Sequence, residues 1–400
     1  LWLTVGALSV AAAAFFLWRL GGDLSAFLYR PGSEVSDLTV TFWPNIHTIK
    51  ETWQVHGQIP LWRTLIFCGS PFDADPQSGL WYPPNLVFAL LPTAMGFNLL
   101  FLAHIIWGGL GMRAWALATG TSEWAALVSA LAYAFTPRLL AHLGFGHAGL
   151  VYAAAWVPWA LWAANRVGSG SWTHAGALGV SLGLQIMAHP QLAFYTGLAS
   201  GAYGAAAALR AGPAVYQPQR PPYGGPAAFT ARLRLVVRRF APLLLGALLA
   251  LALSAVQLLP MLRLAPLTAR ATMDFEATTV SSLPPRYLWG LILAYHRGYA
   301  DYVLYAGVPV LALALLALRR RRAWGWWIFV ILILVYATGT RTPLYRWAYR
   351  VLPGAGWLRG PSRIWFLGVA ALALMAGWGV DELLSGWTRP ARRWLTRAAL

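Results

Sequence analysis

The sequence predicts an all-α polytopic membrane protein with about ten transmembrane helices, and three observations carry that prediction. First, 58% of the 400 residues are hydrophobic and only 10% are charged, whereas soluble domains are about 25% charged. Second, several apolar stretches reach the roughly 20 residues that cross a bilayer core. Third, the short alternating segments typical of a membrane β-barrel do not appear.

Ten apolar segments are expected to form the helices, and the whole chain, 1–400, a single transmembrane domain. The first, Leu1–Leu20, is too long for the apolar part of a signal peptide. A long loop, 21–92, separates it from the second. The remaining predicted helices are Ala94–Ala118, Glu123–Leu140, Ala148–Asn165, His174–Ala188, Leu192–Leu209, Phe240–Pro260, Tyr302–Leu318, Ala323–Thr338 and Ile364–Leu384.

The charge distribution predicts the orientation of these helices. The net charge is +18, but the positive residues gather at the ends of apolar segments, which argues against a nucleic-acid partner. When loops alternate sides, one side collects the arginines of 210–239, 319–322 and 389–397, and the other most carboxylates. Cytoplasmic loops carry the positive excess. We therefore expect cytoplasmic termini and extracytoplasmic loops at 21–92, 261–301 and 339–363.

Two basic stretches on the cytoplasmic side have simple expected roles. The segment 210–239 is Pro/Gly-rich and then basic, which favours a linker that enters an interfacial helix. The run Arg319–Arg322 is typical of an orientation signal that contacts lipid headgroups. The single cysteine, Cys68, excludes an intramolecular disulfide and a cysteine-based metal site.

The opening loop holds five of the 12 acidic residues in the segment 33–92. Ser36 or Asp37 could cap a short helix, and Asp75 stands in "DADPQSG", whose Gly, Pro and Asp are typical of turns. Tryptophans throughout this loop suit the level of the lipid headgroups. We expect the loop to lie on the membrane surface as short helices.

The order of motifs along the chain resembles YfhO-like bacterial membrane proteins. The motifs are "HGQIPLW", "GSPFDADPQSGLWYPPNLVFALLP", "HLGFGHAGLVYAAAWVPWALWA", "MAHPQLAFY", "VQLLPMLRLAPLTAR" and "RGPSRIWFLGVAALALMAGWGVDELL". They cover nearly the whole chain in the family's order. Two features depart from the family: the Pro-Leu-Trp turn runs on as "PLWRT" rather than into Asn-Pro, and the chain is shorter than usual.

The resemblance implies a GT-C fold and transfer of a sugar from a polyprenyl-phosphate carrier outside the cytoplasm of a bacterial inner membrane. In such enzymes the first outer loop carries an essential acid, and Asp37 matches its place. Its carboxylate would accept the proton of an acceptor hydroxyl as that hydroxyl attacks the sugar. Asp75 would be a helper acid or, with Asp37, a ligand of Mg²⁺ or Mn²⁺. Helix cap and turn residue remain the alternative roles.

Candidate substrate-binding residues lie in other outer loops. His142 and His147 flank a predicted turn, Ala141–His147, and His189 and Gln191 lie in the next turn on that side. The i,i+5 spacing of the first pair differs from the i,i+4 pairing of a helical zinc site, so hydrogen bonding to substrate is favoured over metal binding. Arg270, Arg359 and Arg363 are candidates for the phosphate; the alternative is snorkelling to the interface.

The expected partners are a polyprenyl-phosphate-linked sugar, membrane lipids and an unidentified glycan, lipid or protein acceptor. One alternative is a lipid or polysaccharide transporter, which would need ionisable residues within helices and paired broken helices; the acids instead crowd into loops. The second alternative, a non-catalytic subunit for envelope assembly, stays open.

Overall fold

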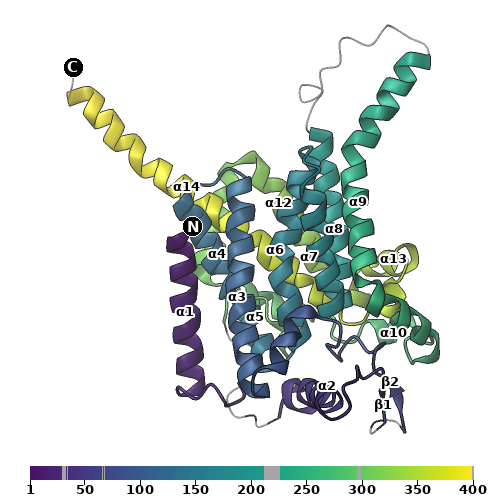
Figure 1. Cartoon of the computed structure of the whole chain (residues 1–400). Helices are drawn as coiled ribbons and strands as arrows, with labels where there is room; N and C mark the ends of the chain where they lie inside the picture. The colour runs from purple at the N-terminus through teal and green to yellow at the C-terminus, as the bar shows by residue number, and fades with distance from the viewer. Residues whose placement is uncertain are drawn as a thin grey trace.

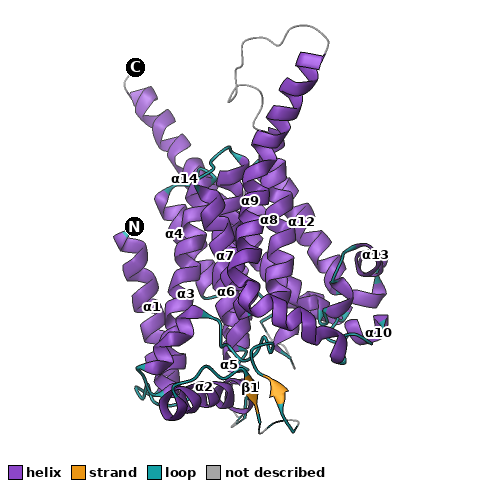
Figure 2. Cartoon of the chain, turned by 45° about the vertical axis from the view of Figure 1, so that its right-hand side comes forward, coloured by secondary structure: helices purple, strands orange, loops and turns teal. Residues whose placement is uncertain are grey.

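The computed structural model describes residues 1–28, 33, 35–64, 66, 68–210, 226–294 and 299–398. It is a helical bundle with a layer of short elements at one end (Figures 1 and 2). Five helical stretches among these residues are long and apolar enough to cross a membrane: Trp2–Leu20, Thr93–Ala118, Glu123–Gly144, Phe240–Leu267 and Pro361–Gly386. The predicted class, an all-α multi-pass membrane protein, is confirmed.

Every predicted helix has a counterpart in the described part of the chain. The counterparts are α1 (Trp2–Leu20), α3 (Thr93–Ala118), α4 (Glu123–Ala134), α6 (Ala148–Gly168), α7 (His174–Ala188), α8 (Pro190–Arg210), α9 (Pro226–Leu264), α11 (Val308–Leu316), α12 (Arg321–Ala337) and α14 (Trp365–Ala398). Most predicted boundaries lie within a few residues of the observed ones. Four differ more, and one of them shapes the candidate site.

The helix predicted over Glu123–Leu140 is interrupted, a break that the prediction did not include. α4 stops at Ala134, and after two non-helical residues a separate helix, α5 (Pro137–Gly144), begins. Pro137 is the physical reason, because proline lacks an amide hydrogen and disfavours helical geometry in the residue before it. The polypeptide therefore changes course at Thr136, and α5 forms a short separate helix ahead of α6.

Three further boundaries also differ. α14 continues to Ala398, well beyond the predicted end at Leu384. α9 begins at Pro226, so the second half of the predicted linker 210–239 is helical, while 211–225 lies outside the described residues. The helix predicted from Tyr302 begins only at Val308, after Gly307 with a φ of 101°. The short 3-10 turn Ala300–Tyr302 precedes it. Asp301 therefore lies in this 3-10 turn rather than in α11, which matters for the site.

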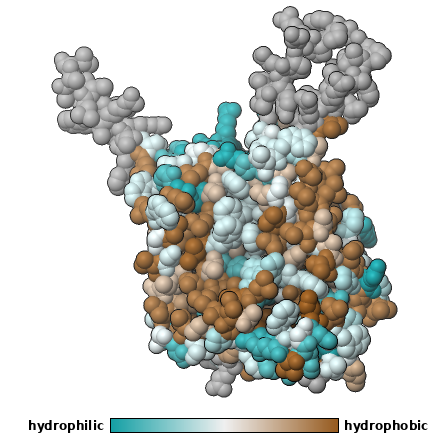
Figure 3. All heavy atoms as spheres, viewed as in Figure 1, coloured by the Kyte–Doolittle hydropathy of each residue, from teal (hydrophilic) through white to brown (hydrophobic). Residues whose placement is uncertain are grey.

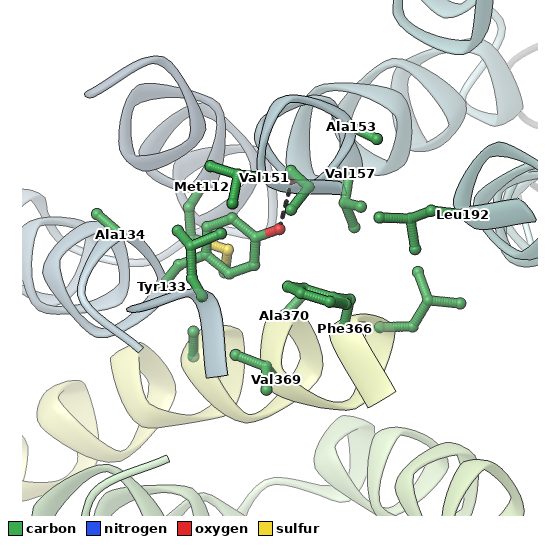
Figure 4. Close-up of a cluster of buried hydrophobic side chains, with 14 of the residues drawn as sticks. Met112, Tyr133, Ala134, Val151, Ala153, Val157, Leu192, Phe366, Val369 and Ala370 are labelled. Atoms are coloured by element: carbon green, nitrogen blue, oxygen red, sulfur yellow. Dashed lines mark hydrogen bonds between the residues drawn. The ribbon is translucent and has the colours of Figure 1, made fainter. Parts of the chain in front are cut away.

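The core of the bundle is built around α14, whose side chains from Trp365 to Trp378 are almost fully buried. Figure 4 shows Phe366, Val369 and Ala370 of α14 in one cluster with Tyr133 of α4. Small residues allow close helix packing: a Cβ on Gly379 would lie 1.9 Å from the carbonyl oxygen of Leu313 on α11.

Other helices present apolar side chains outward. α9 and α12 expose leucines, isoleucines and Trp324, and α1 exposes Trp2 and Trp18. Figure 3 shows apolar residues over much of the visible side of the bundle, with polar residues towards both of its ends. Large exposed apolar areas of this kind mark a surface that water does not cover, as expected for contact with lipid.

The opening loop lies across one end of the bundle as short elements, as predicted (Figures 1 and 2). A π-helical turn (Leu38–Phe42) leads into α2 (Trp43–His56). The two-residue strands β1 (Trp62–Arg63) and β2 (Ser70–Pro71) pair antiparallel, and a 3-10 segment (Pro83–Ala89) leads towards α3. α10 (Phe275–Thr278) and α13 (Pro343–Val351) lie towards the same end. We call this the loop end; the opposite end carries residues 119–123, 317–322 and 381–382.

Candidate functional site

Asp37 is docked on the turn between α5 and α6. Its backbone N–H donates to the carbonyl oxygen of Phe145 at 3.1 Å. Its carboxylate Oδ2 lies 3.4 Å from Nε2 of His147, and its side chain remains 49% exposed. The acid that follows the first helix is therefore held in place by the bundle and still open to a ligand.

Gly146 permits this docking. Its φ is 77°, in the region that favours glycine, and a Cβ there would lie 2.4 Å from the backbone nitrogen of Leu38 and 2.8 Å from Ser36 Oγ. Any larger residue would push the opening loop away from the α5–α6 turn. The "GFGH" sequence thus brings Asp37 and His147 together.

His147 and His142 are hydrogen-bonded to each other, with 2.7 Å between their Nδ1 atoms. The predicted turn Ala141–His147 is wrong, because α5 continues to Gly144 and places His142 within the helix, fully buried. Only Phe145, Gly146 and His147 form the turn. Burial lowers the pKa of His147, and the charges of Asp37 and Asp301 partly oppose that effect. The imidazole of His147 is therefore neutral at pH 7.

Asp301 is the buried counterpart of Asp37. Its Oδ1 lies 3.6 Å from Nε2 of His142 and 3.9 Å from Nη2 of Arg138, and its Oδ2 lies 3.4 Å from Nε of Arg363. Arg138 also donates to the carbonyl oxygens of Asp301, Val303 and Ser362. Asp301, Arg138 and His142 have no exposed side-chain surface.

Sequence reasoning did not single out Arg138 or Asp301. The expectation about loops concerned the acids alone; the buried Arg138 and His142 lie on α5. A signal for Arg138 existed: an arginine inside an apolar helical stretch is by default a functional candidate. Asp301 carried no local signal, because it meets Arg138 only through a contact 163 residues apart.

The three predicted arginines gather on one side of this buried group. Arg363 Nη1 donates to Gln191 Oε1 at 3.2 Å, and Gln191 Nε2 donates to the carbonyl oxygen of Arg359 at 2.6 Å. Arg270 donates to the carbonyl oxygen of Trp357. Gln191 therefore contacts both Arg359 and Arg363 and helps to hold this part of the chain in place.

Arg270 and Arg359 are exposed and have no carboxylate partner among the described residues. The pKa of Arg270 is lowered by partial burial and by the charges of Arg359 and Arg363. Three cations close enough to affect one another, with one carboxylate between them, leave an excess of positive charge that an anion would relieve.

His189 lies between α7 and α8 and is not aimed at an open surface. Its Nδ1 accepts from the backbone N–H of Leu192 at 3.2 Å, which satisfies a donor at the start of α8. Burial, followed by the charge of Arg363, lowers its pKa to about 3. His189 is neutral and supports the fold next to the arginines.

Asp75 belongs to a different set of contacts. It forms an ion pair with Arg63 at 3.7 Å and accepts from the backbone N–H of Gln77, while burial raises its pKa. Arg63 also donates to Asn45 Oδ1. The geometry matches the turn residue that was the alternative role. Within the described ranges, no group of three or more His, Cys, Asp or Glu is arranged to hold a metal ion.

A small pocket opens between the opening loop and the ends of α3, α6 and α7. Its lining is mostly apolar, with Phe42, Phe97 and Met187, and includes the hydroxyl-bearing Tyr82 and Tyr152. Phe42 ends the π-helical turn that begins after Asp37. An apolar recess thus lies beside the segment that carries the exposed acid.

Comparisons with known proteins give a distant structural match. No protein-family model and no curated protein matches the chain. A solved structure of the archaeal oligosaccharyltransferase AglB from Archaeoglobus fulgidus, in complex with an inhibitory peptide and a dolichol-phosphate, aligns with 98% of the chain at 14% identity and a TM-score of 0.46. The chain spans about half (52%) of that structure's length. The resemblance to YfhO-like proteins stays a prediction.

Proposed function

We propose that this protein is an integral-membrane glycosyltransferase of GT-C-like fold. It would move a sugar from a polyprenyl-phosphate carrier to a glycan, lipid or protein acceptor. The reaction would take place at the loop end, facing away from the cytoplasm of a bacterial inner membrane. The observation that carries the proposal is the half-exposed Asp37, held at the surface of the bundle and linked through histidines to an arginine group.

Asp37 would act as the general base. A sugar hydroxyl is a poor nucleophile near neutral pH, so a carboxylate must accept its proton as the oxygen attacks the anomeric carbon. The bond from that carbon to the phosphate oxygen breaks, and its electron pair leaves with the phosphate. One base and one displacement invert the anomeric centre. The neutral His147 would keep the Asp37 carboxylate oriented.

Arg270, Arg359 and Arg363 would hold the phosphate. Guanidinium groups make charge-assisted, two-pronged hydrogen bonds to phosphate oxygens. Two of the three are exposed at the loop end, where a carrier lipid would present its headgroup. The leaving phosphate gains negative charge as the bond breaks, and fixed cations stabilise that change.

The two carboxylates do not fit the cation site that the sequence suggested. Asp75 is engaged by Arg63, and Asp37 faces His147 in a separate set of contacts. We therefore assign no step to Mg²⁺ or Mn²⁺ held by this pair. Membrane lipids around the apolar surface and the lipid-linked sugar remain the proposed partners.

The test is a transfer assay on Asp37→Asn. Membrane vesicles containing the protein are given a radiolabelled polyprenyl-phosphate-linked hexose, and the label that leaves the carrier is measured. Loss of the base should lower the rate about 10²- to 10⁴-fold. The matched control is Asp73→Asn, in the same loop, because no ion pair of Asp73 occurs among the described contacts.

Other results would point to other functions. Sugar that crosses the bilayer while still attached to its carrier would identify a transporter. No turnover by the unsubstituted protein with any polyprenyl-phosphate hexose would favour an assembly subunit. Equal rates for Asp37→Asn and Asp73→Asn would contradict the role of Asp37.

A further inference from the structure

Four ionisable groups form a line from the surface to the core at the loop end. The order is Asp37, His147, His142 and Asp301, with successive separations of 3.4, 2.7 and 3.6 Å between facing atoms. The outer acid is half exposed and the inner acid is fully buried. Each histidine uses both ring nitrogens towards its two neighbours in the line.

The three contacts between these four groups could hold three hydrogen-bonding protons, but two neutral imidazoles supply only two. Each neutral imidazole carries a single N–H, so two protons serve three contacts. One contact is therefore always between two atoms that lack a hydrogen. A third proton would complete the line, with a donor and an acceptor at every contact.

Unpaired atoms mark the inner contact. His142 Nε2 and Asp301 Oδ1 are both buried without a hydrogen-bond partner in the described structure, although they face each other at 3.6 Å. A buried polar atom without a partner costs about 1–3 kcal/mol. A purely structural ion pair of Asp301 with its arginines would not need a histidine at this position.

The charges around the line are nearly balanced. The two carboxylates, Asp37 and Asp301, are matched in number by two guanidinium groups, Arg138 and Arg363, both of which lie against Asp301. Nearby titratable groups that affect His147 or His142 are His189 and these two arginines, and Tyr299 packs against His147. Arg363 connects the line to the proposed phosphate site through Asp301.

We propose that the His142–His147 pair takes over the acceptor's proton from Asp37 and holds it between the two carboxylates until the product leaves. The acceptor O–H bond breaks, its electron pair forms the new glycosidic bond, and the proton passes from Asp37 to Nε2 of His147. His147 then shares it with His142. As the phosphate leaves with its electron pair, the stored proton balances the new negative charge. This step rests on the proposed function.

The first test needs no turnover. The protein is labelled with ¹⁵N-histidine, placed in lipid nanodiscs, and followed by solid-state NMR as the pH falls below 7. His142 and His147 are assigned from the spectra of His142→Asn and His147→Asn. We expect the ring nitrogens of both to shift with one common midpoint, as a shared proton requires. Separate midpoints, or a His142 that does not respond before unfolding, would overturn the relay.

The second test separates a relay from simple support. In His142→Asn the shorter amide can still bond His147, but Asp301 loses its histidine neighbour and keeps only Arg138 and Arg363. We expect kcat to fall about tenfold or more, the KM for the polyprenyl-phosphate hexose to stay constant, and the acid limb of the pH–rate profile to move to lower pH. His104→Asn, at a buried histidine bonded to Tyr82 outside the line, is the control.

The two proposals fail in different ways. A uniform loss at every pH in His142→Asn would overturn the relay and leave Asp37 as the base. A common histidine midpoint without any sugar transfer would leave the shared proton in place and contradict the glycosyltransferase. If His142→Asn does not fold, His147 is assigned from His147→Asn alone, and the titration of the unsubstituted protein still shows whether a second histidine shares its midpoint.

Discussion

The two ends of the bundle both join distant segments through charged groups, but they do so differently. At the opposite end, Arg320 bonds Glu382 at 2.6 Å and lies 3.7 Å from Asp381, and these side chains are 13–22% exposed. At the loop end, Asp301 meets Arg138 and Arg363, and both Asp301 and Arg138 are completely buried. The Arg320 group includes a close ion pair and is partly exposed. The Asp301 group has longer charge–charge distances, is more deeply buried, and leaves Asp301 Oδ1 without a hydrogen bond.

The difference separates a structural contact from a candidate site. The pairs of Arg320 connect the start of α12 to α14, and partial solvation limits their cost. Buried charges at the loop end carry a larger desolvation cost, which loose contacts of 3.4–3.9 Å repay poorly. Buried charges with incomplete pairing beside exposed arginines are typical of a functional site.

Removing one carboxylate at each end should give the largest contrast. Asp301→Asn leaves Arg138 buried without its counter-charge, which should cost about 3–5 kcal/mol of unfolding free energy. Asp381→Asn leaves Arg320 bonded to Glu382 and should cost about 1 kcal/mol or less. Thermal unfolding of both variants in the same detergent measures this. Equal losses would remove the distinction between the ends.

A pair of glycines tests the docking of the opening loop. Gly146 and Gly120 both have positive φ, 77° and 80°, but only at Gly146 would a Cβ meet other atoms. Alanine at either position should lower the unfolding free energy by about 1–2 kcal/mol, because of backbone strain. Gly146→Ala should in addition lower sugar transfer about a hundredfold, since it moves Asp37. Full transfer by Gly146→Ala would show that the docked position of Asp37 is unimportant.

Two exposed arginines sharpen the comparison for ligand binding. Arg359 lies at the loop end and Arg319 at the opposite end. Arg359→Gln should raise the KM for a polyprenyl-phosphate hexose about tenfold, because a charge-assisted hydrogen bond contributes about 1.5 kcal/mol. Arg319→Gln should leave it unchanged. Steady-state kinetics on the two variants measure the two KM values. A larger increase in Arg319→Gln than in Arg359→Gln would indicate that the phosphate binds at the opposite end and not at the loop end.

The helices and much of the candidate site could be predicted from the sequence, because both depend on apolar length and on the distribution of charge. Apolar length fixes which segments cross the bilayer, and alternating charge brought Asp37, His147, Arg270 and Arg363 to one side. The predictions were wrong or incomplete where tertiary contacts determine a helix boundary or the neighbours of a side chain. Pro137 breaks a continuous apolar pattern, and Asp301 joins the site only because α11 begins late, at Val308. Asp75 shared the loop with Asp37, yet sequence proximity did not put the two carboxylates in one contact group.

The smallest expected effect is a pH dependence confined to the loop end. The pKa of His147 is below its ordinary value of about 6.5, so the folded protein binds fewer protons than the unfolded chain in mildly acidic solution. Its contribution to stability is complete above about pH 6.5 and declines as the pH falls towards the lowered pKa. His147→Gln should make the fall in Tm between pH 7.5 and 5 shallower. An unchanged slope would contradict a buried neutral His147.

The most direct measurement is a structure of the protein in lipid with a bound polyprenyl-phosphate analogue. We expect its phosphate to lie against Arg270, Arg359 and Arg363, with the first atoms beyond the phosphate directed towards Asp37. A phosphate bound instead at Arg319–Arg322 of the opposite end would contradict it.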